Sequence, residues 1–168
     1  MNSWYARAAG VALASIYFLR CAATPAQWHF IDGANLIFHE AGHAIFIFFG
    51  QFIHVLMGSG FQVALPAFLA GYFFYTGQKL SAAVCLMWAG QSLVNVSIYA
   101  GDALAMQLPL LGGDGVMHDW HYLLSTTNFL YWTPQVAGTL YATGTAAIFA
   151  GVAAACTLLF REYKQLAK

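Results

Sequence analysis

The chain has 168 residues, of which 61% are hydrophobic and 7% are charged. A soluble domain carries about 25% charged residues, which keep its surface hydrated, so this composition excludes an ordinary soluble domain. Six Lys and Arg residues balance six Asp and Glu residues, and no basic stretch is present to bind phosphates, which excludes nucleic acid as a partner. We therefore expect one integral membrane domain over residues 1–168, surrounded mainly by membrane lipids.

The first apolar stretch, residues 8–19, lies between Arg7 and Arg20. A basic residue followed by a short apolar run is typical of a signal peptide, but no Ala-x-Ala cleavage site follows at a natural distance. We therefore expect a retained helix that either crosses the membrane at a tilt or lies at its surface.

Longer apolar stretches follow, and a helix that spans a bilayer needs about 20 such residues. Four stretches approach or exceed this length: residues 32–57, 61–76, 81–106 and 133–160. The Gly-Ser-Gly at 58–60 predicts a turn between the first two, and the Gly-Gln at 77–78 predicts the next turn. The pattern indicates an all-α fold, a polytopic membrane helix bundle with about four to five spanning helices.

The stretch between the last two spans, residues 107–132, differs in kind from the others. Pro109 and nearby glycines interrupt any helix at its start, and a helical pattern resumes at His118. The stretch is too polar to span the membrane and too apolar for an ordinary water-exposed loop. Because irregular backbone at membrane depth needs protein or a wet cavity around it, we expect a re-entrant or tucked segment.

Basic residues indicate how the chain is oriented. Arg161, Lys164 and Lys168 follow the last span, and short loops rich in Lys and Arg remain in the cytoplasm. We expect an integral protein of a plasma membrane, such as the bacterial inner membrane, with a cytoplasmic C-terminus. Counting spans backwards places Lys79 on the same side and Trp132 on the opposite side.

The run His-Glu-Ala-Gly-His occupies residues 39–43, within the apolar stretch 32–57. On a helix, His39 and His43 lie on one face, one turn apart, so both can bind one zinc ion through a ring nitrogen. Glu40 is adjacent and can act as the general base on a water molecule at that metal. Ionisable residues in an apolar helix are costly in lipid, which favours a functional site. Polar bonding between helices and haem ligation are the alternatives.

A zinc site needs a third protein ligand, and the run His-Asp-Trp-His at 118–121 concentrates the candidates. We favour His118, because imidazole suits zinc and the glycine-rich turn before it can aim the ring. Asp119 would then orient a histidine, or replace His118 as the ligand. Asp114 is the main rival, and we expect His121 to face solvent.

Two further polar residues lie in the predicted spans. His54 falls on the same helix face as His43 but about 16 Å further along a continuous helix, which is too far to share one metal. Asp102 falls within the span 81–106, where it is a candidate metal ligand, proton-relay group or helix-pairing residue.

With the His-Glu motif in a spanning helix, the chain resembles the site-2 protease family of intramembrane zinc metalloproteases. A later segment of that family reads roughly Asn-x-x-Pro-x-x-x-Leu-Asp-Gly, and its Asp is the third zinc ligand. Here Pro109 and Asp114 stand at the matching separation, while Met106 and Gly113 occupy the Asn and Leu positions. The resemblance implies that the histidine pair binds zinc, that the glutamate beside it is the base, and that Asp114 rivals His118.

We therefore expect a membrane-embedded zinc metalloprotease that hydrolyses peptide bonds with a zinc-activated water, acting on a transmembrane peptide. The alternative function is a non-catalytic subunit that joins partner membrane subunits in a larger complex and contains a structural metal or haem. An open coordination position for water distinguishes the two, because a structural zinc site is closed by protein ligands.

Overall fold

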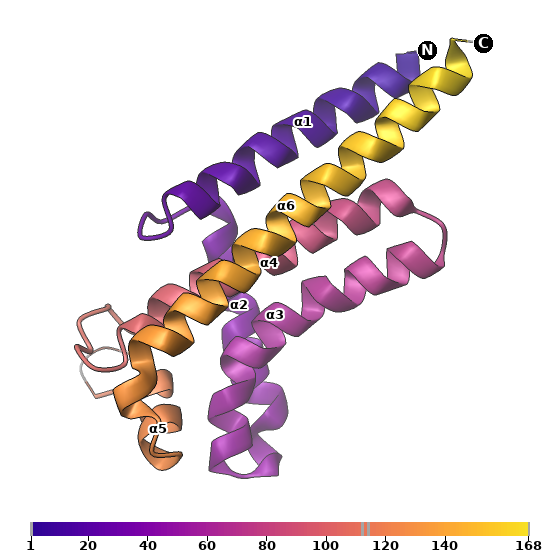
Figure 1. The fold of residues 1–168 in the computed structure, drawn as a ribbon. Helices are drawn as coiled ribbons and strands as arrows, with labels where there is room; N and C mark the ends of the chain where they lie inside the picture. The colour runs from indigo at the N-terminus through magenta and orange to yellow at the C-terminus, as the bar shows by residue number, and fades with distance from the viewer. Residues whose placement is uncertain (1, 112, 114, 168) are drawn as a thin grey trace.

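Figure 1 shows the computed structural model, which describes residues 2–111, 113 and 115–167. These residues form helices and loops and no strand, which confirms the predicted all-α fold. In the same part of the chain, the α-helices are α1 (Asn2–Ala23), α2 (Phe30–Phe46), α3 (Gln51–Tyr75), α4 (Lys79–Gly101), α5 (Asp119–Thr126) and α6 (Thr133–Leu166). Two 3-10 turns, η1 (Ile47–Phe49) and η2 (Leu130–Trp132), precede α3 and α6.

Within the described residues, four helical stretches are long and apolar enough to cross a membrane. They are Trp4–Ala23, Gln51–Tyr75, Lys79–Gly101 and Leu130–Leu166. The prediction of a helical membrane bundle is therefore confirmed. The helix that carries the His-Glu motif, α2, has 17 residues, fewer than the roughly 20 that a spanning helix needs.

The predicted single span over residues 32–57 is wrong, because the chain reverses inside it. α2 ends at Phe46, and after η1 the chain passes through Gly50 into α3. Gly50 has a φ of +84°, in the left-handed region that favours glycine. The turn predicted at 58–60 lies instead inside α3. The apolar run continues through the real turn, so hydrophobicity conceals it, and Gly50 is its one sequence signal.

The predicted turn at 77–78 is present between α3 and α4. Gly77 has a φ of +81°, which a residue with a side chain rarely adopts. Pro66 lies inside α3, where proline removes a backbone hydrogen bond, and α3 changes direction partway along its length (Figure 1). The α3–α4 turn and the C-terminal end of α6 lie toward the same end of the molecule (Figure 1). α4 begins at Lys79, and Lys164 is in the last turn of α6.

α4 is the central helix of the bundle and packs against α6, α3 and α1. α4 and α6 approach closely where two glycines meet: a Cβ built on Gly90 would lie 2.5 Å from the carbonyl oxygen of Gly144, and the reverse distance is the same. Small residues let helix backbones approach closely in lipid. Met87, Val94 and Ile148 fill the core around this crossing. α4, held in place by this packing, also contacts α5.

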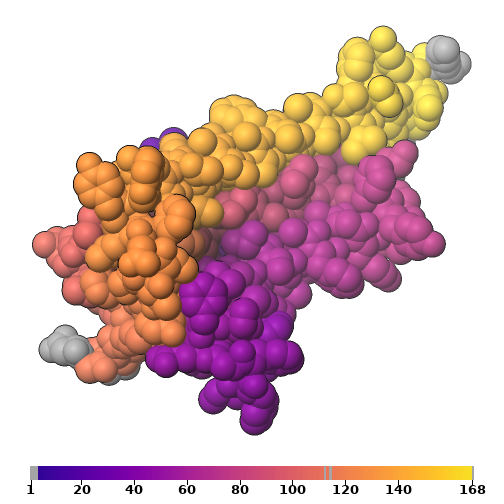
Figure 2. All heavy atoms as spheres, turned by 60° about the horizontal axis from the view of Figure 1, so that its bottom comes forward, coloured from indigo at the N-terminus to yellow at the C-terminus, as the bar shows by residue number. Residues whose placement is uncertain are grey.

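Within the segment 107–132, the start of α5 packs against the rest of the bundle, whereas most of the described irregular stretch before it is exposed. An irregular stretch follows α4, and α5 then contacts α3 and α4 at one end of the molecule (Figure 1). Figure 2 shows the α5 region, in orange, lying against the α2–α3 hairpin, in purple. The start of α5 therefore reaches the hairpin that contains the His-Glu motif.

Candidate metal centre

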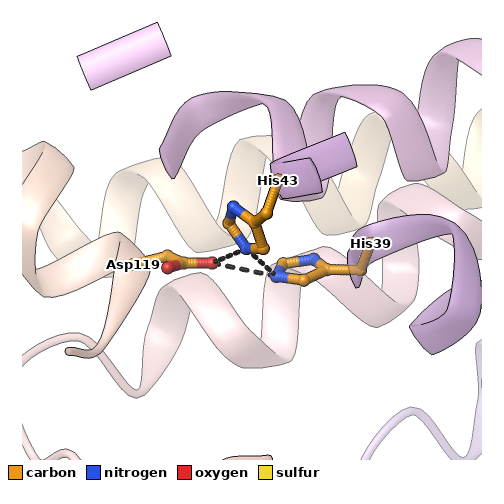
Figure 3. Close-up of side chains that lie close together, drawn as sticks. All are labelled: His39, His43 and Asp119. Carbon is orange, nitrogen blue, oxygen red and sulfur yellow. Dashed lines mark hydrogen bonds and ion pairs between the residues drawn. The ribbon is translucent and has the colours of Figure 1, made fainter. Parts of the chain in front are cut away.

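The two histidines of the motif lie together on the buried face of α2. His39 and His43 are one turn apart, and their Nε2 atoms are separated by 3.0 Å (Figure 3). The rings meet edge to face, with centroids 4.7 Å apart. His39 is 7% exposed. The four-residue spacing therefore places two imidazole nitrogens at one point, as expected for a helix.

Asp119, the first residue of α5, completes a trio with these histidines. Its Oδ2 atom lies 2.9 Å from Nε2 of His39 and 3.1 Å from Nε2 of His43 (Figure 3). Burial raises the pKa of the Asp119 carboxyl, but its close interactions with the rings of His39 and His43 outweigh burial and hold that pKa below its usual value. A carboxylate binds a metal in its deprotonated form, which a lowered pKa favours.

The α2–α3 hairpin fixes the orientation of the His43 ring. Its Nδ1–H donates to the backbone carbonyl of His54 at 2.9 Å, so Nε2 is left facing the trio. The Nδ1 of His54 returns a hydrogen bond to the carbonyl of His43, also at 2.9 Å. The prediction that His54 lies about 16 Å away is wrong, because it assumed one continuous helix. The reversal at Gly50 brings the two rings to a centroid distance of 5.0 Å.

Two glycines allow α3 to lie directly against the histidines. A Cβ on Gly58 would lie 2.5 Å from Nε2 of His43 and 2.7 Å from Nε2 of His39. A Cβ on Gly42 would lie 2.0 Å from the carbonyl oxygen of Met57. Sequence reasoning missed this role, since it assigned Gly58 to a turn. The space beside the Gly58 Cα lies next to both donor nitrogens.

His118, the residue favoured as third ligand, lies outside the trio. It is the N-cap of α5, and its Nδ1 accepts the backbone N–H of His121 at 3.2 Å. Its Nε2 lies 3.3 Å from Oδ2 of Asp102. The last residue before a helix and the first residue in it point their side chains in different directions, so Asp119 reaches the histidines and His118 does not. Asp114 lies outside the described residues.

His121 does not simply face solvent as expected. Its ring is partly buried, and Nδ1 lies 2.8 Å from the carbonyl oxygen of Ala103. Trp120, between His121 and Asp119, donates its indole N–H to Oγ of Ser59 on α3 at 3.1 Å. The side chains of the His-Asp-Trp-His run thus connect the start of α5 to α3 and to the end of α4.

Glu40 faces the cavity on which the trio opens. This cavity measures about 570 Å³, and its walls include Glu40 and all three side chains of the trio. Leu108 and Met117, from the irregular stretch before α5, contribute to its largely apolar lining. Glu40 is exposed and makes no hydrogen bond or ion pair within the part of the chain that the structure describes. Its carboxylate is therefore free to act on a molecule in the cavity.

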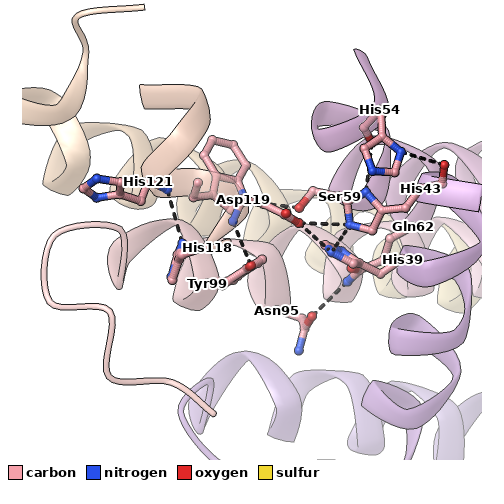
Figure 4. A network of polar contacts seen from close by, with 11 residues as sticks. His39, His43, His54, Ser59, Gln62, Asn95, Tyr99, His118, Asp119 and His121 are labelled. Carbon is pink, nitrogen blue, oxygen red and sulfur yellow. Dashed lines mark hydrogen bonds and ion pairs between the residues drawn. The ribbon is translucent and has the colours of Figure 1, made fainter. Parts of the chain in front are cut away.

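A buried polar network links the cavity wall to α2, α3 and α4. Oδ1 of Asp32 accepts the side-chain N–H groups of Gln91 at 2.7 Å and Asn95 at 3.1 Å. Asn95 in turn accepts from Gln62 at 2.8 Å (Figure 4). Sequence reasoning missed this network, although a charged residue and several amides within apolar stretches were the available signal. Because each amide joins two helices, the network fixes the position of α2, which carries the histidine pair.

The trio fits a divalent metal ion. Zinc lies about 2.0–2.1 Å from histidine nitrogens, so tetrahedral ligand atoms stand about 3.3 Å apart. The donor atoms of the trio are 2.9–3.1 Å apart, so they need to separate by only a few tenths of an ångström. A haem fits less well, because two axial ligands must face each other across the macrocycle, whereas His39 and His43 point at one spot from one helix.

Sequence and structure comparisons add no named relative to this geometry. No protein-family model, curated protein or solved structure matches the chain. The metal centre is therefore described from its own residues: His39, His43 and Asp119 converge within one buried group that could hold a metal ion.

Proposed function

We propose that this chain is a membrane-embedded zinc metalloprotease. The observation that carries the proposal is the placement of Glu40 beside the trio in one cavity of a helical membrane bundle. Two histidines and a carboxylate are a donor set used by hydrolytic zinc sites, which keep a further position for water. A structural site would be closed, whereas here all three side chains border an open space.

Each residue has a distinct task in the proposed reaction. Bound by the trio, zinc supplies Lewis-acid chemistry, polarising a carbonyl group and making water more acidic. Glu40 accepts the proton of the attacking water and delivers it to the departing amine. Its exposed and unpaired carboxylate is suited to this exchange, because no hydrogen bond within the described residues must break first.

The surroundings of the site favour a peptide in the membrane as the substrate. The cavity is lined mostly by apolar residues and lies among helices apolar enough to span a bilayer. An extended segment of a transmembrane peptide presents apolar side chains to such walls. We further propose that the protein resides in the bacterial inner membrane with its C-terminus in the cytoplasm, because basic residues gather at the end of α6.

The proposal is tested by hydrolysis in proteoliposomes. Purified protein with zinc should cleave reporter peptides derived from transmembrane segments, and Glu40→Gln should abolish cleavage while retaining the metal. A decrease of about 10²–10⁴-fold is expected for loss of a general base. Cleavage by Glu40→Gln at the wild-type rate would refute the role of Glu40, and a metal-loaded wild type that cleaves no peptide in a diverse library would support the non-catalytic alternative.

A further inference from the structure

Asp102 is a junction between three parts of the chain near the metal centre. It follows α4 as its C-cap residue. Its carboxylate accepts the backbone N–H groups of Gln107 at 3.0 Å and Leu108 at 2.9 Å. Oδ2 also lies 3.3 Å from Nε2 of His118. Asp102 therefore joins the end of α4 to the start of the irregular stretch and to the start of α5.

The two ring nitrogens of His118 have complementary roles. Nδ1 accepts the backbone N–H of His121, so this nitrogen carries no proton. The ring proton is then on Nε2, where it is donated to the Asp102 carboxylate. The ring is buried and packs at a tilt against the Tyr99 ring, with centroids 4.5 Å apart. His118 thus has one defined tautomer and one defined position.

The same arrangement determines where Asp119 stands. Its backbone N–H donates to the hydroxyl of Tyr99 at 3.0 Å (Figure 4). Its Oδ2 atom lies 2.9 Å from Nε2 of His39 and 3.1 Å from Nε2 of His43. Nothing else in the described part of the chain holds that carboxylate, so its position relative to the two histidines follows from the placement of the first turn of α5.

We propose that Asp102 and His118 are positioning residues that set the metal affinity of the trio by holding Asp119 in place. The inference builds on the proposed metal site and names residues that do not themselves bind the ion. Partners that orient metal ligands typically change metal affinity about 10–100-fold when they are removed. The pair also connects Leu108, in the cavity wall, to the helix that carries Asp119.

A simpler explanation is that His118 only caps α5. Substitutions distinguish this capping role from the positioning role. Asn is among the best N-cap residues, so His118→Asn retains an acceptor for the N–H groups of the first turn. It cannot reach Asp102 as the ring does. Asp102→Asn leaves His118 intact and removes the charge that fixes its ring. If capping were the whole role, both variants would bind metal as the wild type does.

The experiment measures the zinc dissociation constant of the full-length protein in detergent by competition with a chelator. His118→Asn and Asp102→Asn should each weaken zinc binding about 10–100-fold, and the visible spectrum of the cobalt-substituted protein should change with them. Ser125→Ala is the matched control, because its hydroxyl bonds only within α5, to the carbonyl of Tyr122. Thermal unfolding of the metal-free proteins checks that each variant is folded.

Zinc binding within twofold of the wild type in both variants would overturn the positioning role. If only one variant is folded, that variant decides the question. The result is separable from the proposed protease activity, since a wild type that binds zinc but cleaves nothing leaves the positioning role intact. A wild type that binds no zinc would overturn the site and the positioning role together.

Discussion

Gly58→Ala places a methyl group against the donor atoms of the metal centre. The added Cβ would lie 2.5 Å from Nε2 of His43 and 2.7 Å from Nε2 of His39, well inside contact distance. The ring of His43 cannot turn away freely, because its Nδ1–H is bonded to the carbonyl of His54. Overpacking of this kind costs about 1–3 kcal/mol. Zinc needs both Nε2 atoms in these positions, so any ring displacement that relieves the contact in the metal-free protein must be reversed on binding. Since 1.4 kcal/mol corresponds to a factor of ten, zinc affinity should then fall roughly 10–100-fold.

Gly60→Ala is the matched control for this substitution. It lies on the same helix two residues later, and its Cβ would approach only the flexible side chain of Met57, at 3.1 Å from the sulfur. Both changes replace a helical glycine by alanine, which favours the helix by up to about 1 kcal/mol. Chelator competition should therefore show weakened zinc binding for Gly58→Ala alone. Equal zinc affinity in the two variants would refute the packing of α3 over the histidines.

Two further predictions concern how the site and the bundle are held together. Trp120→Phe and Ser59→Ala should each lower the free energy of unfolding by about 1 kcal/mol through loss of the indole hydrogen bond. The double variant should lose little more than either single variant. Additive losses in SDS titration would show that the two side chains do not interact. Gly144→Ala should destabilise the α4–α6 crossing by about 1–3 kcal/mol. Gly138→Ala, with nothing within 4 Å of its Cβ, should not, and equal unfolding midpoints would contradict the close approach.

The helical class and the position of the histidine pair could be predicted because both depend on local pattern. Low charge and long apolar stretches determine the class, and a spacing of four residues on a helix brings His39 and His43 to one face. The reversal at Gly50 could not be predicted in this way. Its flanking residues are apolar on both sides, so the same hydrophobic run serves two antiparallel helices. Because the reversal was not predicted, the contact between His43 and His54 was not predicted either.

Whether His118 or Asp119 faces the histidine pair depends on the residue at which α5 begins. The sequence determines this start only to within about one residue. A helix that starts at Asp119 turns the His118 ring toward Asp102 and directs the next carboxylate to the histidines. Helix ends are uncertain by one or two residues in sequence patterns, and here that uncertainty changes which residue completes the trio. Gly58 is a similar case, since a glycine in an apolar stretch suggests a turn unless its partner helix is known.

Metal content of purified variants tests the central claim most directly. Protein expressed with zinc and purified without added metal should contain about one zinc per chain in the wild type and in Glu40→Gln, because Glu40 acts on water rather than on the ion. Asp119→Ala should contain almost none, since it removes one of the three donors. The proposed metal centre is contradicted if Asp119→Ala and a His39→Ala/His43→Ala double variant both contain as much zinc as the wild type.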